Sequence, residues 1–214
     1  MKRFIPVLLL GTLAATAPAG AQTAPRFELT PFLGYQFGGG YEFDGGKFEA
    51  QPGMGWGVTA SFSVGRGGWV DLTYIRQDTK VDLDSRSGLI PSREDAADLD
   101  LNYFHIGGHR EFGDPYSKLK PYLGGALGAV LYSPSVGDTD FDDNWQFSFG
   151  FNGGFKYFMG QSQRVGLRFD MRGLWFWVPS DDYGYWCDFY GCFVVQGTET
   201  VAQGLASAGL VFRF

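Results

Sequence analysis

The sequence predicts an all-β protein, an eight-stranded antiparallel transmembrane β-barrel preceded by a cleavable signal peptide. Three observations lead to this prediction. Apolar and polar residues alternate in eight segments, the connections between these segments are alternately short and long, and the chain ends on an aromatic residue within the last segment. Because successive side chains of a strand point to opposite faces, a period of two indicates strands with one apolar face each.

The first 21 residues have the features of a secretory signal peptide. Two cations precede an apolar run at positions 5–15, and small residues then lead up to Ala21. We therefore expect export, cleavage between Ala21 and Gln22, and a mature barrel domain of residues 22–214. In the mature chain the longest uncharged stretch, residues 121–137, is shorter than the ~18 residues that a membrane helix needs.

The composition is typical of a membrane barrel and argues against one class of partner. Glycine accounts for 33 of 214 residues, aromatic residues for 18% and charged residues for only 19%. Glycine permits close strand approach, and aromatic residues form belts at the two membrane interfaces. Loss of the signal peptide removes two of 17 cations against 23 acids, which leaves a net charge of −8. Nucleic-acid binding needs a basic face and is therefore not expected.

The first three segments each set an outward apolar row against an inward polar row. The outward rows run from Phe27 to Phe37, from Trp56 to Val64 and from Val70 to Tyr74. Glu28 and Asp71 lie in the opposite rows, and we expect both carboxylates to face the lumen.

The fourth and fifth segments, residues 98–112 and 122–132, are less regular. In the fourth, three apolar residues in an outward phase are followed by two in the other phase, namely Leu99, Leu101 and Tyr103, and then Phe104 and Ile106. We predict a β-bulge between them, because one extra residue exchanges the two faces of a strand. The fifth is mostly Gly, Ala and Leu, and its facing stays open.

The last three segments alternate clearly. The sixth has an aromatic row from Phe147 to Tyr157 opposite Lys156, and the eighth ends the chain at residues 201–214. The seventh sets an apolar row, Val165–Trp177, against three charged residues, Arg168, Asp170 and Arg172. Strands of ~10 residues with one apolar face match the tilted span of a bilayer.

The charges in the inward rows are expected to plug the lumen, which in an eight-stranded barrel is only wide enough for side chains. The candidates are Glu28, Asp71, Lys156, Arg168, Asp170, Arg172 and Arg213. The seventh segment alone has two cations and one acid, so carboxylates from other strands must balance it, and Glu28 and Asp71 are the best candidates by phase.

The connections follow a strict alternation. Those at 65–68, 113–119 and 160–164 are short, and those at 39–52, 79–97, 133–144 and 179–200 are long. Tight turns on one side and larger loops on the other are the topology of outer-membrane barrels. The even number of strands places both chain ends on the periplasmic side.

The sequence offers little catalytic or metal-binding chemistry. His105 and His109 share a face in a strand but lie ~13 Å apart, too far for one ion, and we interpret them as polar or interfacial residues. A Ser-His nucleophile would require a serine from another strand, because none lies within three positions. The acidic run 138–149 lacks the glycine and glutamate of an EF-hand. We expect no enzyme activity, no dedicated metal site and no cofactor, and loose binding of divalent cations by this acidic run stays open.

Cys187 and Cys192 are the two cysteines of an exported chain, and we predict a disulfide between them in the fourth external loop. The short ring limits the stabilisation to roughly 2 kcal/mol. Mass spectrometry of the unreduced peptide should therefore detect the linked pair, and two free thiols would contradict the prediction.

From residue 26 to 214 the chain resembles the small eight-stranded outer-membrane barrels, a group that includes the transmembrane domain of outer membrane protein A, outer membrane proteins X and W, and the opacity proteins. The resemblance depends on Leu29–Tyr35, Lys120–Gly125, Gly153–Phe158 and the terminal residues Gly209, Phe212 and Phe214. It implies a monomer in the outer membrane of a Gram-negative cell, in contact with lipid and lipopolysaccharide. The terminal pattern looks like the signal read by the outer-membrane insertion machinery.

Three functions remain open. The first is a structural or interaction barrel, adhesin-like or envelope-stabilising, which acts through its external loops. The second is a narrow channel for ions or small apolar solutes, as the likeness to outer membrane protein W allows. The third is a lipid-A-modifying enzyme. A plugged lumen favours the first function over an open pore.

Overall fold

The computed structural model describes residues 27–43, 46–85, 93–114, 117–136, 139–140, 144–178, 184–188, 191–195 and 199–214. The predicted signal peptide and its cleavage site at Ala21 and Gln22 lie outside the described residues. Within the described ranges, no helix is long and apolar enough to cross a membrane.

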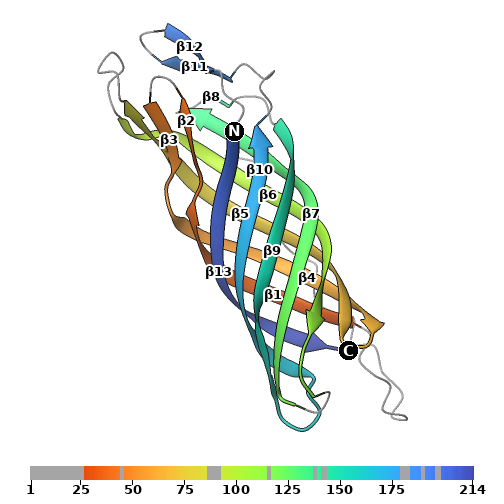
Figure 1. Cartoon of the computed structure of the whole chain (residues 1–214). Helices are drawn as coiled ribbons and strands as arrows, with labels where there is room; N and C mark the ends of the chain where they lie inside the picture. The colour runs from red at the N-terminus through yellow and green to blue at the C-terminus, as the bar shows by residue number, and fades with distance from the viewer. Residues whose placement is uncertain are drawn as a thin grey trace.

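Eight long antiparallel strands wrap into a closed barrel (Figure 1). They are β1 (Phe27–Gly38), β4 (Gly53–Gly65), β5 (Gly68–Ser85), β6 (Arg93–Glu111), β7 (Leu119–Val136), β9 (Asn144–Met159), β10 (Val165–Val178) and β13 (Glu199–Arg213). Their order around the barrel is β5-β4-β1-β13-β10-β9-β7-β6, and pairing between β5 and β6 closes the ring. The predicted fold class is confirmed.

The seam of the barrel joins the first strand to the last. Leu29 of β1 pairs with Phe212 of β13, and the amide of Phe214 donates to the carbonyl of Phe27 at 2.9 Å. No edge strand of the barrel is therefore left unpaired, which lipid requires. Gly209 also lies on β13. Recognition of these terminal residues by insertion machinery stays a prediction.

Tight turns lie at the lower end of Figure 1, together with the C-terminus, and the longer connections lie at the upper end. The upper connections contain short strands: β2 (Gly40–Phe43), β3 (Gly46–Ala50), β8 (Thr139–Asp140), β11 (Gly184–Asp188) and β12 (Gly191–Val195). The second connection is more ordered than expected. β5 continues to Ser85 and β6 begins at Arg93, so much of the predicted loop 79–97 is strand.

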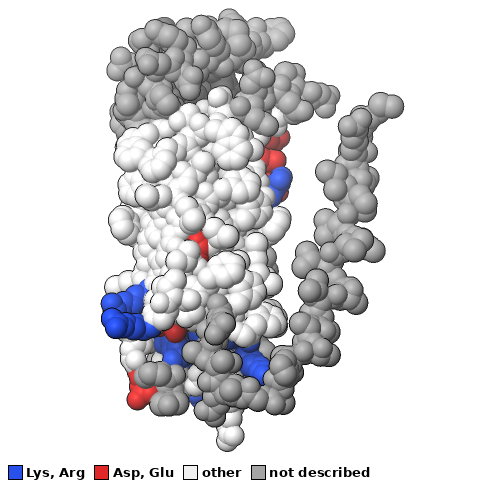
Figure 2. All heavy atoms as spheres, turned by 90° about the vertical axis from the view of Figure 1, so that its right-hand side faces the viewer, with Lys and Arg blue, Asp and Glu red and all other residues white. Residues whose placement is uncertain are grey.

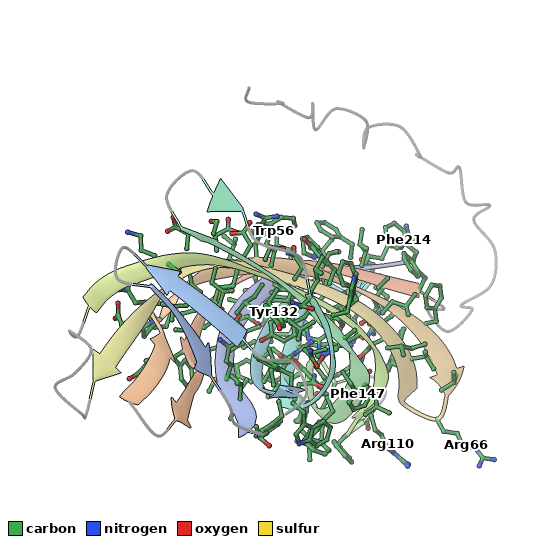
Figure 3. All side chains as sticks on the ribbon, turned by 90° about the horizontal axis from the view of Figure 1, so that it is seen from above. Trp56, Arg66, Arg110, Tyr132, Phe147 and Phe214 are labelled. Atoms are coloured by element: carbon green, nitrogen blue, oxygen red, sulfur yellow. The ribbon has the colours of Figure 1, made fainter. Side chains whose placement is uncertain are left out.

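An apolar band covers the outer face of the barrel. Leu33, Leu123 and Phe151 are each more than 60% exposed there, a fraction that would be unfavourable in water. Trp56 and Phe147 lie on this outer face, whereas Tyr132 packs toward the inside, as the view from above shows (Figure 3). The predicted outward rows of the first three, the sixth and the seventh segments are those observed.

The predicted bulge in the fourth segment was wrong. β6 pairs with β5 without a register shift from Arg110 to Ala97, so one phase holds throughout that stretch. The outward residues are Phe104 and Ile106, whereas Leu101 and Tyr103 are buried in the lumen. Luminal residues were assumed to be polar, but the upper half of the lumen is apolar. This reversal, and not an extra residue, produces the change of pattern.

The two cysteines lie on the β11–β12 hairpin, in a sheet separate from the barrel. The backbone pairs Cys187 directly opposite Cys192. Their side chains lie outside what the structure describes, so the disulfide stays a prediction.

Candidate functional site in the barrel lumen

The lower lumen is filled by a buried ion-pair network around Glu28 and Lys156, both 0% exposed. The ammonium of Lys156 donates to a Glu28 oxygen at 2.6 Å and to a Glu111 oxygen at 2.8 Å. Arg213 donates through Nε to the other Glu28 oxygen at 2.6 Å and through Nη2 to Glu111 at 3.2 Å. The four residues come from β1, β9, β6 and β13, so the network ties together strands from opposite sides of the barrel.

His109 extends this network toward β5. Its Nε2 lies 2.8 Å from the Lys156 ammonium and its Nδ1 lies 2.6 Å from an Asp71 oxygen. Because an ammonium can only donate, Nε2 accepts the hydrogen bond from Lys156. Nδ1 therefore carries the hydrogen of the neutral imidazole and donates a hydrogen bond to the Asp71 carboxylate. Trp69 stacks on the imidazole, and the Lys156 ammonium lies 5.0 Å from the Trp69 ring centroid. The cation is therefore held by charge, hydrogen bonds and an aromatic face together.

The acidic and imidazole groups around Lys156 have the spacing of a metal-binding site. Ligand atoms of Glu28, His109 and Glu111 lie within 4.8 Å of one another. The Lys156 ammonium contacts all three, so it occupies the position that a bound cation would take.

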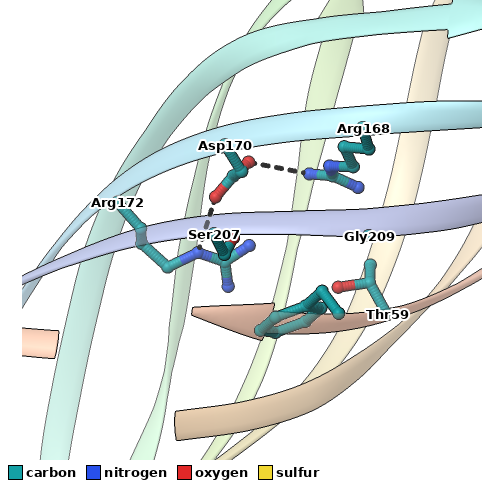
Figure 4. Close-up of a pocket in the computed structure, with 7 residues that line it drawn as sticks. Thr59, Arg168, Asp170, Arg172, Ser207 and Gly209 are labelled. Atoms are coloured by element: carbon teal, nitrogen blue, oxygen red, sulfur yellow. Dashed lines mark hydrogen bonds and ion pairs between the residues drawn. The ribbon is translucent and has the colours of Figure 1, made fainter. Parts of the chain in front are cut away.

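A second cluster lies around Asp170 in the middle of the lumen (Figure 4). Arg168 approaches one carboxylate oxygen of Asp170 at 3.1 Å, and Arg172 approaches the other at 3.4 Å. The hydroxyl of Tyr122 donates to Asp170, as does the amide of Asn152 at 3.1 Å. Arg168 Nε donates in turn to the Tyr122 hydroxyl at 2.8 Å, which places the guanidinium over the tyrosine ring.

A small cavity lies beside this cluster. Its volume is about 10 Å³, which is room for about one water molecule. Polar side chains form much of its wall, and the full lining is Phe32, Thr59, Arg168, Asp170, Arg172, Ser207 and Gly209.

The upper lumen is closed by an apolar core, which we call the apolar plug. It consists of Ile75, Leu101, Tyr103, Val130, Leu174, Phe176, Val201 and Leu205. Phe32, Leu99 and Tyr132 pack against it. Among polar groups at this level, Gln203 accepts hydrogen bonds from Gln36 and from the Tyr103 hydroxyl, each at 2.5 Å. The plug lies between the buried charges and the external connections.

His105 and Ser148 form a cross-strand pair that local sequence spacing could not reveal. His105 Nε2 lies 2.6 Å from Ser148 Oγ, and the glycine between them on β7, Gly128, leaves room for the contact. Ser148 is 0% exposed, and His105 Nδ1 has no hydrogen-bond partner among the described residues. Within the described part of the chain, the pair thus has neither access for a substrate nor the carboxylate of a catalytic triad.

The structure places every predicted luminal charge inside the barrel, but with partners that differ from those expected. Arg168 and Arg172 share the acid of their own strand, whereas Glu28 pairs with Lys156 and Arg213, and Asp71 with His109. Sequence reasoning missed Glu111, His109 and Tyr122. All three lie in the inward phase of their strands, and this phase could have identified them as luminal residues from the sequence.

No family model and no curated protein matches the sequence. The fold of this chain matches solved structures over most of their length and most of its own. Neisserial surface protein A is 17% identical, with a TM-score of 0.60 over 88% of this chain and 97% of that one. A major outer membrane protein from Thermus thermophilus is 12% identical, with a TM-score of 0.56 over 90% and 100%. The outer membrane protein AlkL, determined in lipid bilayers, is 15% identical, with a TM-score of 0.54 over 92% and 95%. This chain therefore has the fold of the small eight-stranded outer-membrane β-barrels.

Proposed function

We propose that the protein is a monomeric barrel of the bacterial outer membrane with a closed lumen, and that it acts through its external connections in a structural or interaction role. The observation that carries the closed lumen is the packing inside it. Paired charges fill the lower half, the apolar plug fills the upper half, and the cavity between them holds about one water molecule. Such a lumen offers no path to a hydrated ion.

The external connections are strongly acidic, which limits their partners. Segments 39–52, 79–97, 133–144 and 179–200 contain 15 of the 23 acidic residues and 4 cations, a net charge of −11. We therefore infer partners of positive charge, or lipopolysaccharide phosphates bridged by divalent cations, and no nucleic acid. The inaccessible Ser148 supports a role other than catalysis.

Two measurements test this proposal. The protein should fractionate with the outer membrane and run with heat-modifiable mobility on gels, as a folded barrel does. In planar lipid bilayers the purified protein should give only rare, small channel events. Recovery in the soluble periplasmic fraction would contradict the location, and a steady open conductance would contradict the closed lumen.

The apolar plug gives specific support to a second candidate function, a narrow path for small apolar solutes. Its inward surface comes from residues such as Leu174 and Leu205, which would accept a hydrocarbon and reject an ion. Uptake of a small alkane by vesicles that contain the protein, without ion conductance, would favour this candidate over the first.

A further inference from the structure

Among the residues that the structure describes, four exposed cations lie around the lower end of the barrel. Arg66 is in the β4–β5 turn, Arg110 is near the end of β6, Lys118 precedes β7 and Arg164 precedes β10. None of the four has a side-chain hydrogen bond or ion pair in the described part of the chain. We call these four residues the basic rim. In the face that Figure 2 shows, Lys and Arg atoms gather at the lower edge of a belt of mostly uncharged residues, where some Asp and Glu atoms also lie.

The upper end of the barrel has the opposite charge. One outward cation there, Arg76, already holds two carboxylates, that of Asp78 at 2.8 Å and that of Asp100 at 2.9 Å. Among the described residues, the cations of the basic rim have no ion pair of this kind. The lower edge therefore presents an unbalanced positive charge.

Arg66 is held in a conformation that its backbone does not favour. Its φ is 52°, in the left-handed region, within a turn whose neighbours Gly65 and Gly67 have φ of 87° and 77°. Glycine adopts this region freely, whereas other residues do so at a cost of order 1 kcal/mol. The turn geometry therefore does not explain an arginine at this position, and a function of its charge would.

The position of Arg110 indicates whether the basic rim contacts lipid or the space below the membrane. Arg110 lies in the outward row of β6 with Phe104 and Ile106, and its register partners are Gly68 and Leu123. Leu123 is 65% exposed on the lipid face. A long side chain in this position covers apolar surface with its stem and places its guanidinium at the edge of the bilayer, where the lipid phosphates lie. A residue in this outward row points toward lipid, away from a cell-wall polymer below the membrane.

We infer that the basic rim binds the phosphates of anionic phospholipids in the inner leaflet of the membrane. Guanidinium groups suit this ligand, because they donate paired hydrogen bonds to phosphate oxygens. The inference rests on the proposed membrane location, and it adds a lipid-binding surface at the end of the barrel remote from the external loops.

Native mass spectrometry in a nonionic detergent tests the inference, with phosphatidylglycerol and phosphatidylcholine of identical chains as the probes. The wild-type protein should bind phosphatidylglycerol more tightly, and the double variant Arg66→Gly/Arg110→Gln should raise the apparent Kd for it about tenfold or more. Binding of phosphatidylcholine should stay unchanged. Arg76→Gln at the opposite end is the matched control and should bind as the wild type does.

Two further measurements separate the alternatives. Insertion of the double variant into phosphatidylcholine vesicles should be normal, because Arg66→Gly relieves an unfavourable φ. A failure of the wild type to insert would refute the membrane location, whereas equal binding of both lipids would overturn only the basic rim. Weaker co-sedimentation of the double variant with purified peptidoglycan, with phosphatidylglycerol binding unchanged, would assign the surface to the cell wall and also overturn the inference.

Discussion

The Glu28→Ala variant is expected to lose about 3–5 kcal/mol of unfolding free energy, because removing one partner leaves a buried charge uncompensated. Here two charges are affected. Lys156 and Arg213 each donate to Glu28 at 2.6 Å, and after the substitution they would share only Glu111. Arg213 also pairs with Glu28 in the register of β1 and β13, so the loss falls on the seam that closes the barrel.

Urea unfolding of the protein in lipid vesicles, followed by tryptophan fluorescence, measures this effect. Thr30→Ala is a matched control, because Thr30 is equally buried on the same row of β1 and its hydroxyl has no partner in the described part of the chain. Its loss should be about 1 kcal/mol or less. If Glu28→Ala and Thr30→Ala unfolded at the same urea concentration, the lower network would not contribute to barrel stability.

The direction of a side chain was predictable in most strands, because the alternation depends only on residue order. Lys156 and Asp170 could be assigned to the lumen in this way. The fourth segment failed because its inward residues near the upper end, Leu101 and Tyr103, are apolar. Alternation then no longer distinguishes lumen from lipid, and only pairing with the neighbouring strands does so.

The partners of the luminal charges could not be predicted, because they depend on register and on strands that meet across the barrel. Glu28 and Lys156 are 128 positions apart in sequence. His105 reaches Ser148 only because β7 places a glycine between them. A period of two defines which face a residue occupies, but it contains no information on the height at which two strands are aligned.

The Asp170→Ala variant is also expected to lose about 3–5 kcal/mol of unfolding free energy, because Arg168 and Arg172 both depend on this one carboxylate. Asp170→Asn should lose less, since it keeps an oxygen to accept from Tyr122 and Arg168. Ser207→Ala is the matched control, because Ser207 pairs with Asp170 in register and lines the same cavity but carries no charge. Equal thermal stability of Asp170→Ala and Ser207→Ala in detergent would contradict the role of the charge.

The conductance of these variants tests how the lumen is closed, because the network around Glu28 and Lys156, the cluster around Asp170 and the apolar plug form three barriers in series. Asp170→Ala enlarges the small cavity and frees two guanidinium groups, but Leu174 and Phe176 still close the lumen above them. We expect Asp170→Ala, Phe176→Ala and their double variant each to show only rare, small channel events in planar bilayers, because the network around Glu28 and Lys156 still fills the lower lumen. A steady conductance in the wild type, unchanged by Asp170→Ala, would overturn the closed lumen. A steady conductance in Asp170→Ala alone would show that the cluster around Asp170 is the only effective barrier and that the network and the plug are permeable to ions.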